Sequence, residues 1–210
     1  MVVVFGAYHG SMTELTGRFQ TGWHDLEPPA RRALELAYQS LAAGGLACGA
    51  VITDAYGHLV AEGHNRAYDP PGGTDALQGT PLAHAELNAF AAVRTGRDLA
   101  GCTQLSTQRP CSMCAAAAVF LGVGTVRHLA PDPWALASGQ PHSAVSMGPA
   151  ADLWVVTANL LFLLSIASKA GIDHPTVVGT KSPITATRSR PCRDRMDDFA
   201  RNRRRMTVRL

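Results

Sequence analysis

Two short motifs constrain this chain more than any other feature of its 210 residues. His84-Ala85-Glu86 precedes Pro110-Cys111-Ser112-Met113-Cys114 by about two dozen residues. An imidazole and two thiolates are preferred zinc ligands, and three protein ligands leave the fourth tetrahedral position open for water. Structural zinc sites close that position with a fourth protein ligand, but the other three cysteines form no second Cys-x-x-Cys pair. The motifs therefore predict a catalytic site with His84, Cys111 and Cys114 as metal ligands.

The local pattern predicts how these ligands meet. Pro110 favours the first position of a helix, so we expect a helix from Cys111 to Leu121 with both thiols in its first turn. A second helix is expected from about His84 to Arg94. His84 and Glu86 diverge by roughly 200° on a regular helix, so they can share one metal only at the helix start. The Glu86 carboxylate is then the candidate proton shuttle. A structural zinc knuckle and cysteines packed without metal are the alternatives.

In order and spacing, His-x-Glu followed by Pro-Cys-x-x-Cys resembles the zinc-dependent cytidine and deoxycytidylate deaminase-like superfamily. Gly63-His64-Asn65-Arg66 extends the likeness to the guanine deaminase and tRNA adenosine deaminase branch. The resemblance implies a Zn²⁺ cofactor, a catalytic Glu86, and substrate contacts from Asn65 and the backbone around Ala85. It also implies hydrolytic deamination, in which hydroxide attacks an amine-bearing ring carbon and ammonia leaves. The alternative for Asn65 is an asparagine that ends a strand in a left-handed turn.

Hydrophobic periodicity predicts the elements around the motifs. An amphipathic helix is expected from Pro28 to just before Gly44, then a hairpin over 49–65, and strands over 102–107 and 124–130. With the motif helices, this order resembles the three-layer α/β/α cytidine deaminase-like sandwich with a mixed central sheet. We expect an arm at 1–27, the deaminase domain at 28–135, an extension with an apolar helix at 136–187, and an arginine-rich tail at 188–210.

Composition limits location and partners. Five cysteines, two of them in a metal motif, fit a reducing cytoplasm better than a disulfide framework. The apolar run over 153–167 falls short of the roughly 20 residues that span a bilayer, so we expect no membrane contact. The tail carries nine arginines and three aspartates, a net charge of +6, whereas the whole chain is +3. The remainder is therefore −3, which disfavours a large phosphate-rich partner over the site.

Three hypotheses follow for what enters the pocket. The first is a small nucleobase or nucleoside, because the core is not basic. The second is adenosine in tRNA, favoured by Gly63-His64-Asn65-Arg66 and by RNA contact through the arginine-rich tail. The third is a noncatalytic, zinc-stabilised module, motivated by Arg109, which replaces the glutamate usual before Pro-Cys in this branch. Arg109 either meets an anionic substrate group or points away. Relatives often form dimers, so we also expect a homodimer.

Overall fold

Five strands in the part of the chain that the structure describes form one mixed sheet. β1 (Gly49–Thr53) pairs antiparallel with both β2 (Leu59–His64) and β3 (Thr103–Gln108). β3 pairs parallel with β4 (Thr125–Ala130), which pairs parallel with β5 (Ser146–Met147). The spatial order is β2-β1-β3-β4-β5. The computed structural model describes residues 12–70, 73, 75–133, 146–147, 152–174 and 176–177.

The hairpin and the two later strands are confirmed, but β5 was not expected. It lies in the extension expected at 136–187, before the apolar helix. A two-residue strand is too short to show the alternation by which strands are recognised, so the sequence carried no signal for it. The arginine-rich tail at 188–210 lies outside the described residues, and the prediction of RNA contact through it stays a prediction.

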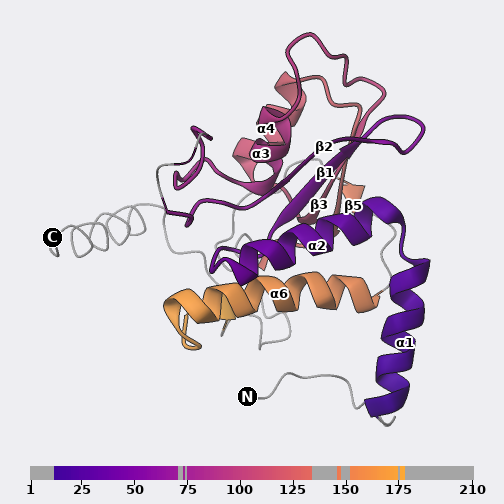
Figure 1. Ribbon diagram of the computed structural model, residues 1–210, viewed down its shortest axis with the longest axis vertical. Coiled ribbons are helices and arrows are strands. Elements are labelled where there is room, and N and C mark those ends of the chain that lie inside the picture. The colour runs from indigo at the N-terminus through magenta and orange to yellow at the C-terminus, as the bar shows by residue number, and fades with distance from the viewer. Residues whose placement is uncertain are drawn as a thin grey trace, which may run out of the picture.

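One face of the sheet is covered by α2 (Pro28–Ala42) and α6 (Asp152–Ala170) (Figure 1). α2 starts at the predicted proline pair and ends before Gly44, whose φ of 78° stops the helix. The helix packs tightly on β1, because a Cβ added to Gly49 would lie 2.1 Å from the Ala33 carbonyl oxygen. The buried apolar cluster on this face comprises Leu26, Ala30, Ala33, Leu34, Leu36, Val51, Leu105, Leu129, Ala130, Trp154 and Ala158.

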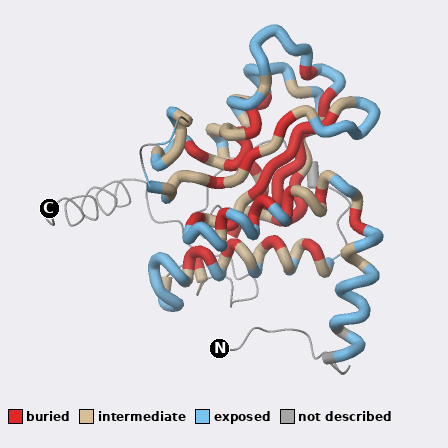
Figure 2. Tube along the Cα trace, in the orientation of Figure 1, coloured by how far each residue is buried: buried red, intermediate tan, exposed pale blue. Residues whose placement is uncertain are grey.

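The opposite face is covered by α3 (Ala85–Ala91) and α4 (Ser112–Phe120) (Figure 1). β2 approaches α3 closely at Gly63, which has no side chain to separate the two backbones. The strands form the buried centre between the two helical layers (Figure 2). This arrangement confirms the three-layer α/β/α sandwich with a mixed central sheet. The second apolar cluster comprises Ala50, Ile52, Ala61, Ala85, Ala89, Phe90, Leu99, Cys102 and Ala118.

α6 is longer than the sequence pattern indicated. Its 19 residues make it long and apolar enough to cross a membrane, so the argument that the segment is too short was wrong. In the structure, however, one side of α6 packs against α2 and the sheet. Gln108 Nε2 donates to the Ala158 carbonyl oxygen at 2.8 Å, and the Ala47 N–H donates to Ser165 Oγ at 3.1 Å. These contacts bury one side of α6, whereas Val156, Leu160 and Leu164 on the helix stay exposed.

The N-terminal region contains a helix where we expected an irregular arm. α1 (Met12–Asp25) is largely exposed and lies at one end of the α2 and α6 layer (Figure 2). The rings of Phe19 and Trp23 lie 5.2 and 5.7 Å from that of Trp154 in α6. The apolar residues Met12, Leu15, Phe19 and Trp23 recur at helical spacing, so the sequence did contain a signal for this helix.

Candidate metal centre and active site

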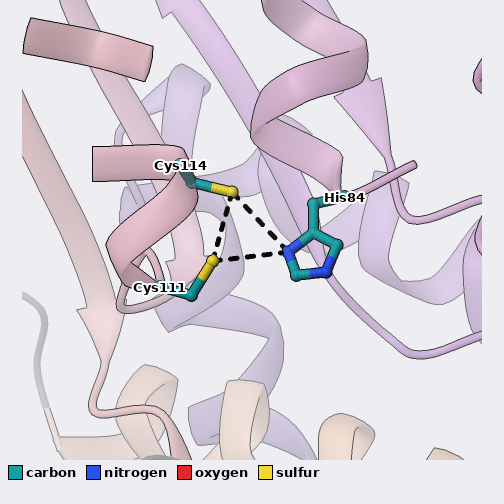
Figure 3. Close-up of side chains that lie close together, drawn as sticks. All are labelled: His84, Cys111 and Cys114. Carbon is teal, nitrogen blue, oxygen red and sulfur yellow. Dashed lines mark hydrogen bonds between the residues drawn. The ribbon is translucent and has the colours of Figure 1, made fainter. Parts of the chain in front are cut away.

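Two helices begin at the same point and bring the three predicted ligands together. His84 is the N-cap residue of α3, Cys111 is the N-cap of α4, and Cys114 lies in the first turn of α4. His84 Nδ1 lies 3.7 Å from Cys111 Sγ and 3.6 Å from Cys114 Sγ, and the two sulfur atoms are 3.6 Å apart (Figure 3). These three form the metal-ligand cluster in the described part of the chain.

The separations fit one zinc ion. Zinc bonds of about 2.3 Å to sulfur and 2.0–2.1 Å to nitrogen place neighbouring atoms of a tetrahedron about 3.5–3.8 Å apart. The three measured distances lie in this range. The side chains also converge with Nδ1 of His84 turned towards the sulfur atoms (Figure 3). The cluster therefore supplies three corners of a tetrahedron, as the motif spacing predicted.

The electrostatics favour a thiolate at this cluster. The Cys111 and Cys114 sulfur atoms share a hydrogen bond, and together with the neighbouring His84 it lowers the pKa of Cys111 to about 4. The pKa of Cys114 is raised, chiefly by the same hydrogen bond and by its burial. The pKa of His84 is raised, chiefly by its hydrogen bond with Cys111. A negatively charged Cys111 thiolate is therefore available to bind a cation.

Glu86 lies in the first turn of α3 and is only 6% exposed. Its Oε2 accepts a hydrogen bond from Cys114 Sγ at 3.5 Å, so the carboxyl group borders the ligand cluster. Burial raises its pKa. His84 and Glu86 can share one metal only at the start of a helix. The structure meets this requirement, because α3 starts at Ala85, immediately after His84. A group that can hold and release a proton thus lies against the metal ligands.

Asn65 follows β2 and is joined to the segment that leads into His84. The Arg66 N–H donates to the Ala83 carbonyl oxygen at 2.9 Å, and Asn88 Nδ2 donates to the His64 carbonyl oxygen at 2.7 Å. Asn65 itself is 3% exposed. Ala85, the other predicted substrate contact, is fully buried as the first residue of α3. The structure therefore brings the Gly63-His64-Asn65-Arg66 stretch to the zinc-ligand segment.

Arg66 organises the loop that enters the site, a role that the motif alone did not reveal. Its guanidinium donates to Asp69 Oδ2 at 3.0 Å, to Asp75 Oδ2 at 2.7 Å and to Gln78 Oε1 at 2.6 Å. Its carbonyl oxygen accepts from the Gly79 N–H at 3.0 Å. The described part of the 67–80 loop is therefore folded around one arginine. The two aspartates in an otherwise weakly charged stretch were the available signal.

Two further residues lie near the site. The backbone N–H of Arg109 donates to the Ala130 carbonyl oxygen at 2.9 Å, which extends the pairing of β3 with β4 up to Pro110. Cys48 precedes β1, and burial raises the pKa of its thiol, with smaller contributions from the charges of Glu86, Asp132 and Cys111. Cys48 is far from Cys111 and Cys114 in the sequence, so the Cys-x-x-Cys motif gave no sign that it lies near them in the structure.

A separate hollow of about 600 Å³ lies between α1, α2 and α6. Its walls are mostly apolar and include Phe19, Trp23, Tyr38 and Leu161. It contains neither the three ligands nor Glu86, so it is distinct from the metal centre. We place the chemistry at the ligand cluster rather than in this hollow. Among the described residues, the cluster is where metal ligands lie beside a buried carboxyl group.

Comparison with known proteins decides the family. Residues 25–130, half of the chain, match the family model of the cytidine and deoxycytidylate deaminase zinc-binding region. The chain belongs to this deaminase family. Its zinc site is the cluster of His84, Cys111 and Cys114. The match ends at β4, yet α6 packs into the same core.

The relatives of this chain differ in their activities. Over 110 residues it is 34% identical to the tRNA(Ile)-lysidine synthase of Deinococcus radiodurans, a match that covers 51% of this chain and 18% of that protein. The chain thus spans less than a fifth of this relative. A structure from a study of A-to-I editing by tRNA:A34 deaminases matches with a TM-score of 0.50 and 25% identity, over 63% of this chain and 97% of that one. Guanine deaminase from Nitrosomonas europaea shares the fold, with a TM-score of 0.50, 22% identity and coverage of 65% and 85%.

Proposed function

We propose that this deaminase removes the amino group of a small nucleobase or nucleoside by zinc-dependent hydrolysis and releases ammonia. The observation that carries the proposal is Glu86. A structural zinc site requires only ligands, whereas here a buried carboxyl group lies 3.5 Å from the sulfur atom of a ligand. Such a group can move protons next to a metal. Its presence argues against a noncatalytic module.

The chemistry divides between metal and protein. Zinc, when held by His84, Cys111 and Cys114, supplies a Lewis acid that makes hydroxide available near neutral pH. Glu86 accepts the proton that water loses, returns it to a ring nitrogen, and carries a second proton to the departing amine. The ring carbon gains an oxygen atom and loses nitrogen as ammonia, so the reaction consumes one water molecule. Asn65 and the backbone at Ala85 hold the ring in place.

A free base or nucleoside is the preferred substrate class. Without the tail at 188–210, the chain carries a net charge of −3, which is a poor match for a large polyanion. The second candidate is adenosine in tRNA. It is favoured by the 25% identity to the structure from the tRNA:A34 deaminase study, which covers nearly all of that chain. The two candidates predict different salt dependence, because phosphate contacts weaken steeply as salt rises.

The proposal includes a cytoplasmic homodimer. An apolar patch at the end of α4, made of Val119, Phe120 and Leu121, supports self-association, because Phe120 is 89% exposed. The five cysteines, two of them in the metal motif, do not suggest a set of disulfide bonds, which supports a reducing compartment. Sedimentation of wild-type protein and of Phe120→Ser tests the dimer. A concentration-independent monomer in the wild type would contradict it.

Ammonia release from the zinc-loaded protein tests the proposed function. The panel contains guanine, cytosine, adenine, their nucleosides and nucleotides, and a tRNA anticodon stem-loop. We expect turnover of one free small molecule that is insensitive to salt between 50 and 200 mM, the interval over which a phosphate-dominated interaction weakens by about 10³ or more. Turnover of the stem-loop alone, with strong salt dependence, would replace the first candidate with the second. No turnover of any compound by protein with one zinc per chain would contradict both.

A further inference from the structure

The backbone of Asn65 is held on every side. Its N–H donates to the Cys48 carbonyl oxygen at 2.9 Å, and its own carbonyl oxygen accepts from Ser40 Oγ at 2.8 Å. The N–H of the same peptide group, which belongs to Arg66, donates to the Ala83 carbonyl oxygen at 2.9 Å. One peptide group is thus clamped between α2 and the segment that immediately precedes the zinc ligand. Its orientation depends on both clamps.

The side chain of Asn65 is oriented as well. Its Oδ1 accepts a hydrogen bond from the Ala67 N–H at 3.1 Å. A backbone N–H can only donate, so the oxygen and not the nitrogen of the amide must face Ala67. Asn65 Nδ2 has no acceptor among the described residues. It is nevertheless not one of the buried, unpartnered side-chain atoms, so it keeps some contact with solvent. The amide nitrogen is therefore the group left to donate.

Ser40 is placed to hold this arrangement. It is fully buried near the end of α2, and its carbonyl oxygen accepts from the Gly45 N–H at 2.7 Å while the Gly44 N–H donates to Leu41 at 2.9 Å. These two bonds end the helix in a Schellman motif. A Cβ added to Gly45 would lie 3.4 Å from the Asn65 carbonyl oxygen, so the helix end and the peptide are in direct contact. The hydroxyl therefore has a fixed direction.

We infer that Ser40 is a positioning residue for the substrate, acting through Asn65. Its hydroxyl holds the Asn65–Arg66 peptide so that Asn65 Nδ2 faces the substrate as a donor. This inference rests on the proposed function and on the role of Asn65 in that function. The substrate then presents a hydrogen-bond acceptor at that point, such as a ring nitrogen, a carbonyl oxygen or a hydroxyl oxygen. Alanine at position 40 leaves the Asn65 carbonyl oxygen without its donor and lets the peptide turn.

A double-mutant cycle between Ser40→Ala and Asn65→Ala tests the inference in the zinc-loaded full chain. Loss of one positioning hydrogen bond raises KM by about three- to tenfold in Ser40→Ala, with kcat changed less than about twofold and zinc retained. In the Asn65→Ala background, Ser40→Ala has no further effect on KM, because the side chain that it positions is gone. Ser40→Thr keeps the hydroxyl and the wild-type KM. If Ser40→Ala does not fold, Ser40→Cys, similar in size but a weaker donor, takes its place.

Ser165→Ala is the matched control, because Ser165 is another fully buried serine whose Oγ donates to a helix carbonyl oxygen, that of Phe162, at 2.6 Å. Its effect on KM is expected to be additive with that of Asn65→Ala. Additive effects of Ser40→Ala and Asn65→Ala in an active enzyme would overturn the inference and leave the proposed function intact. Lack of turnover by the wild-type protein would overturn both. Asn65→Asp, which cannot donate, should raise KM as much as Asn65→Ala; a wild-type KM in Asn65→Asp would overturn the donor assignment.

Discussion

Gly63→Ala tests how the close approach of β2 to α3 positions the active site. A Cβ at this position would lie 2.5 Å from both the Ala85 carbonyl oxygen and the Ala89 backbone nitrogen, two backbone atoms of α3. Ordinary contact begins near 3.4 Å, so α3 must retreat by about 0.9 Å. Neither partner is a flexible side chain that can turn aside. The strain falls on the helix that begins after His84 and carries Glu86.

The expected cost has two parts. Overpacking of a buried contact destabilises by about 1–3 kcal/mol, which corresponds to a fall in Tm of roughly 2–12 °C for a chain of this size. Displacement of a catalytic group by about 1 Å can reduce the rate by about a hundredfold. We therefore expect kcat for ammonia release to fall by about ten- to a hundredfold, well beyond the effect expected from partial unfolding at 25 °C.

Differential scanning calorimetry and ammonia release measure the two parts separately. Gly101→Ala is the control, because an added Cβ there meets nothing within 4 Å. This variant should keep its Tm within about 2 °C and its full activity. If Gly63→Ala matched Gly101→Ala in both stability and turnover, the close approach would not position α3 and the reasoning would be wrong.

Three further perturbations test the fold around the site. Arg32 holds the pKa of Glu62 below its usual range through a hydrogen bond, so their pairing stabilises the folded state above pH 4.5 and is lost as pH falls through the lowered pKa. Glu62→Gln should therefore cost about 0.5–1 kcal/mol in urea unfolding at pH 7, and progressively less as the pH is lowered below 4.5. Trp154→Ala should cost about 3–5 kcal/mol, against less than about 1 kcal/mol for the exposed Val156→Ala, and equal costs would contradict the packing of α6. Arg66→Met should make the 67–80 loop a site of rapid proteolysis, and unchanged cleavage would refute its organising role.

The parts of the fold that could be predicted are those with a local signal. Pro110 favoured a helix start, and the spacing of His84 and Glu86 required a second start at the same point. Both helices begin within a residue of the predicted positions. The C-terminal end of α4 also lies within a residue of its prediction, at Phe120 rather than Leu121, whereas α3 stops at Ala91 rather than Arg94. No glycine or proline marks that end, so the pattern continued beyond the helix.

The parts that could not be predicted depend on contacts between distant segments. Ser40 resembles any small residue on an amphipathic helix until α2 is packed next to the end of β2. Arg66 gains its role only when the loop folds back to bring Asp75 and Gln78 to its guanidinium. Such contacts leave no periodicity in the sequence.

The most direct measurement is zinc content together with ammonia release for the wild type, Glu86→Gln and Cys111→Ala. Glu86→Gln preserves the shape of the side chain but removes its ability to move a proton, so it should bind one zinc per chain and lose turnover by at least about 10²-fold. Cys111→Ala removes a ligand and should lose both zinc and activity. Retention of full turnover by Glu86→Gln would contradict the central claim that this carboxyl group is catalytic.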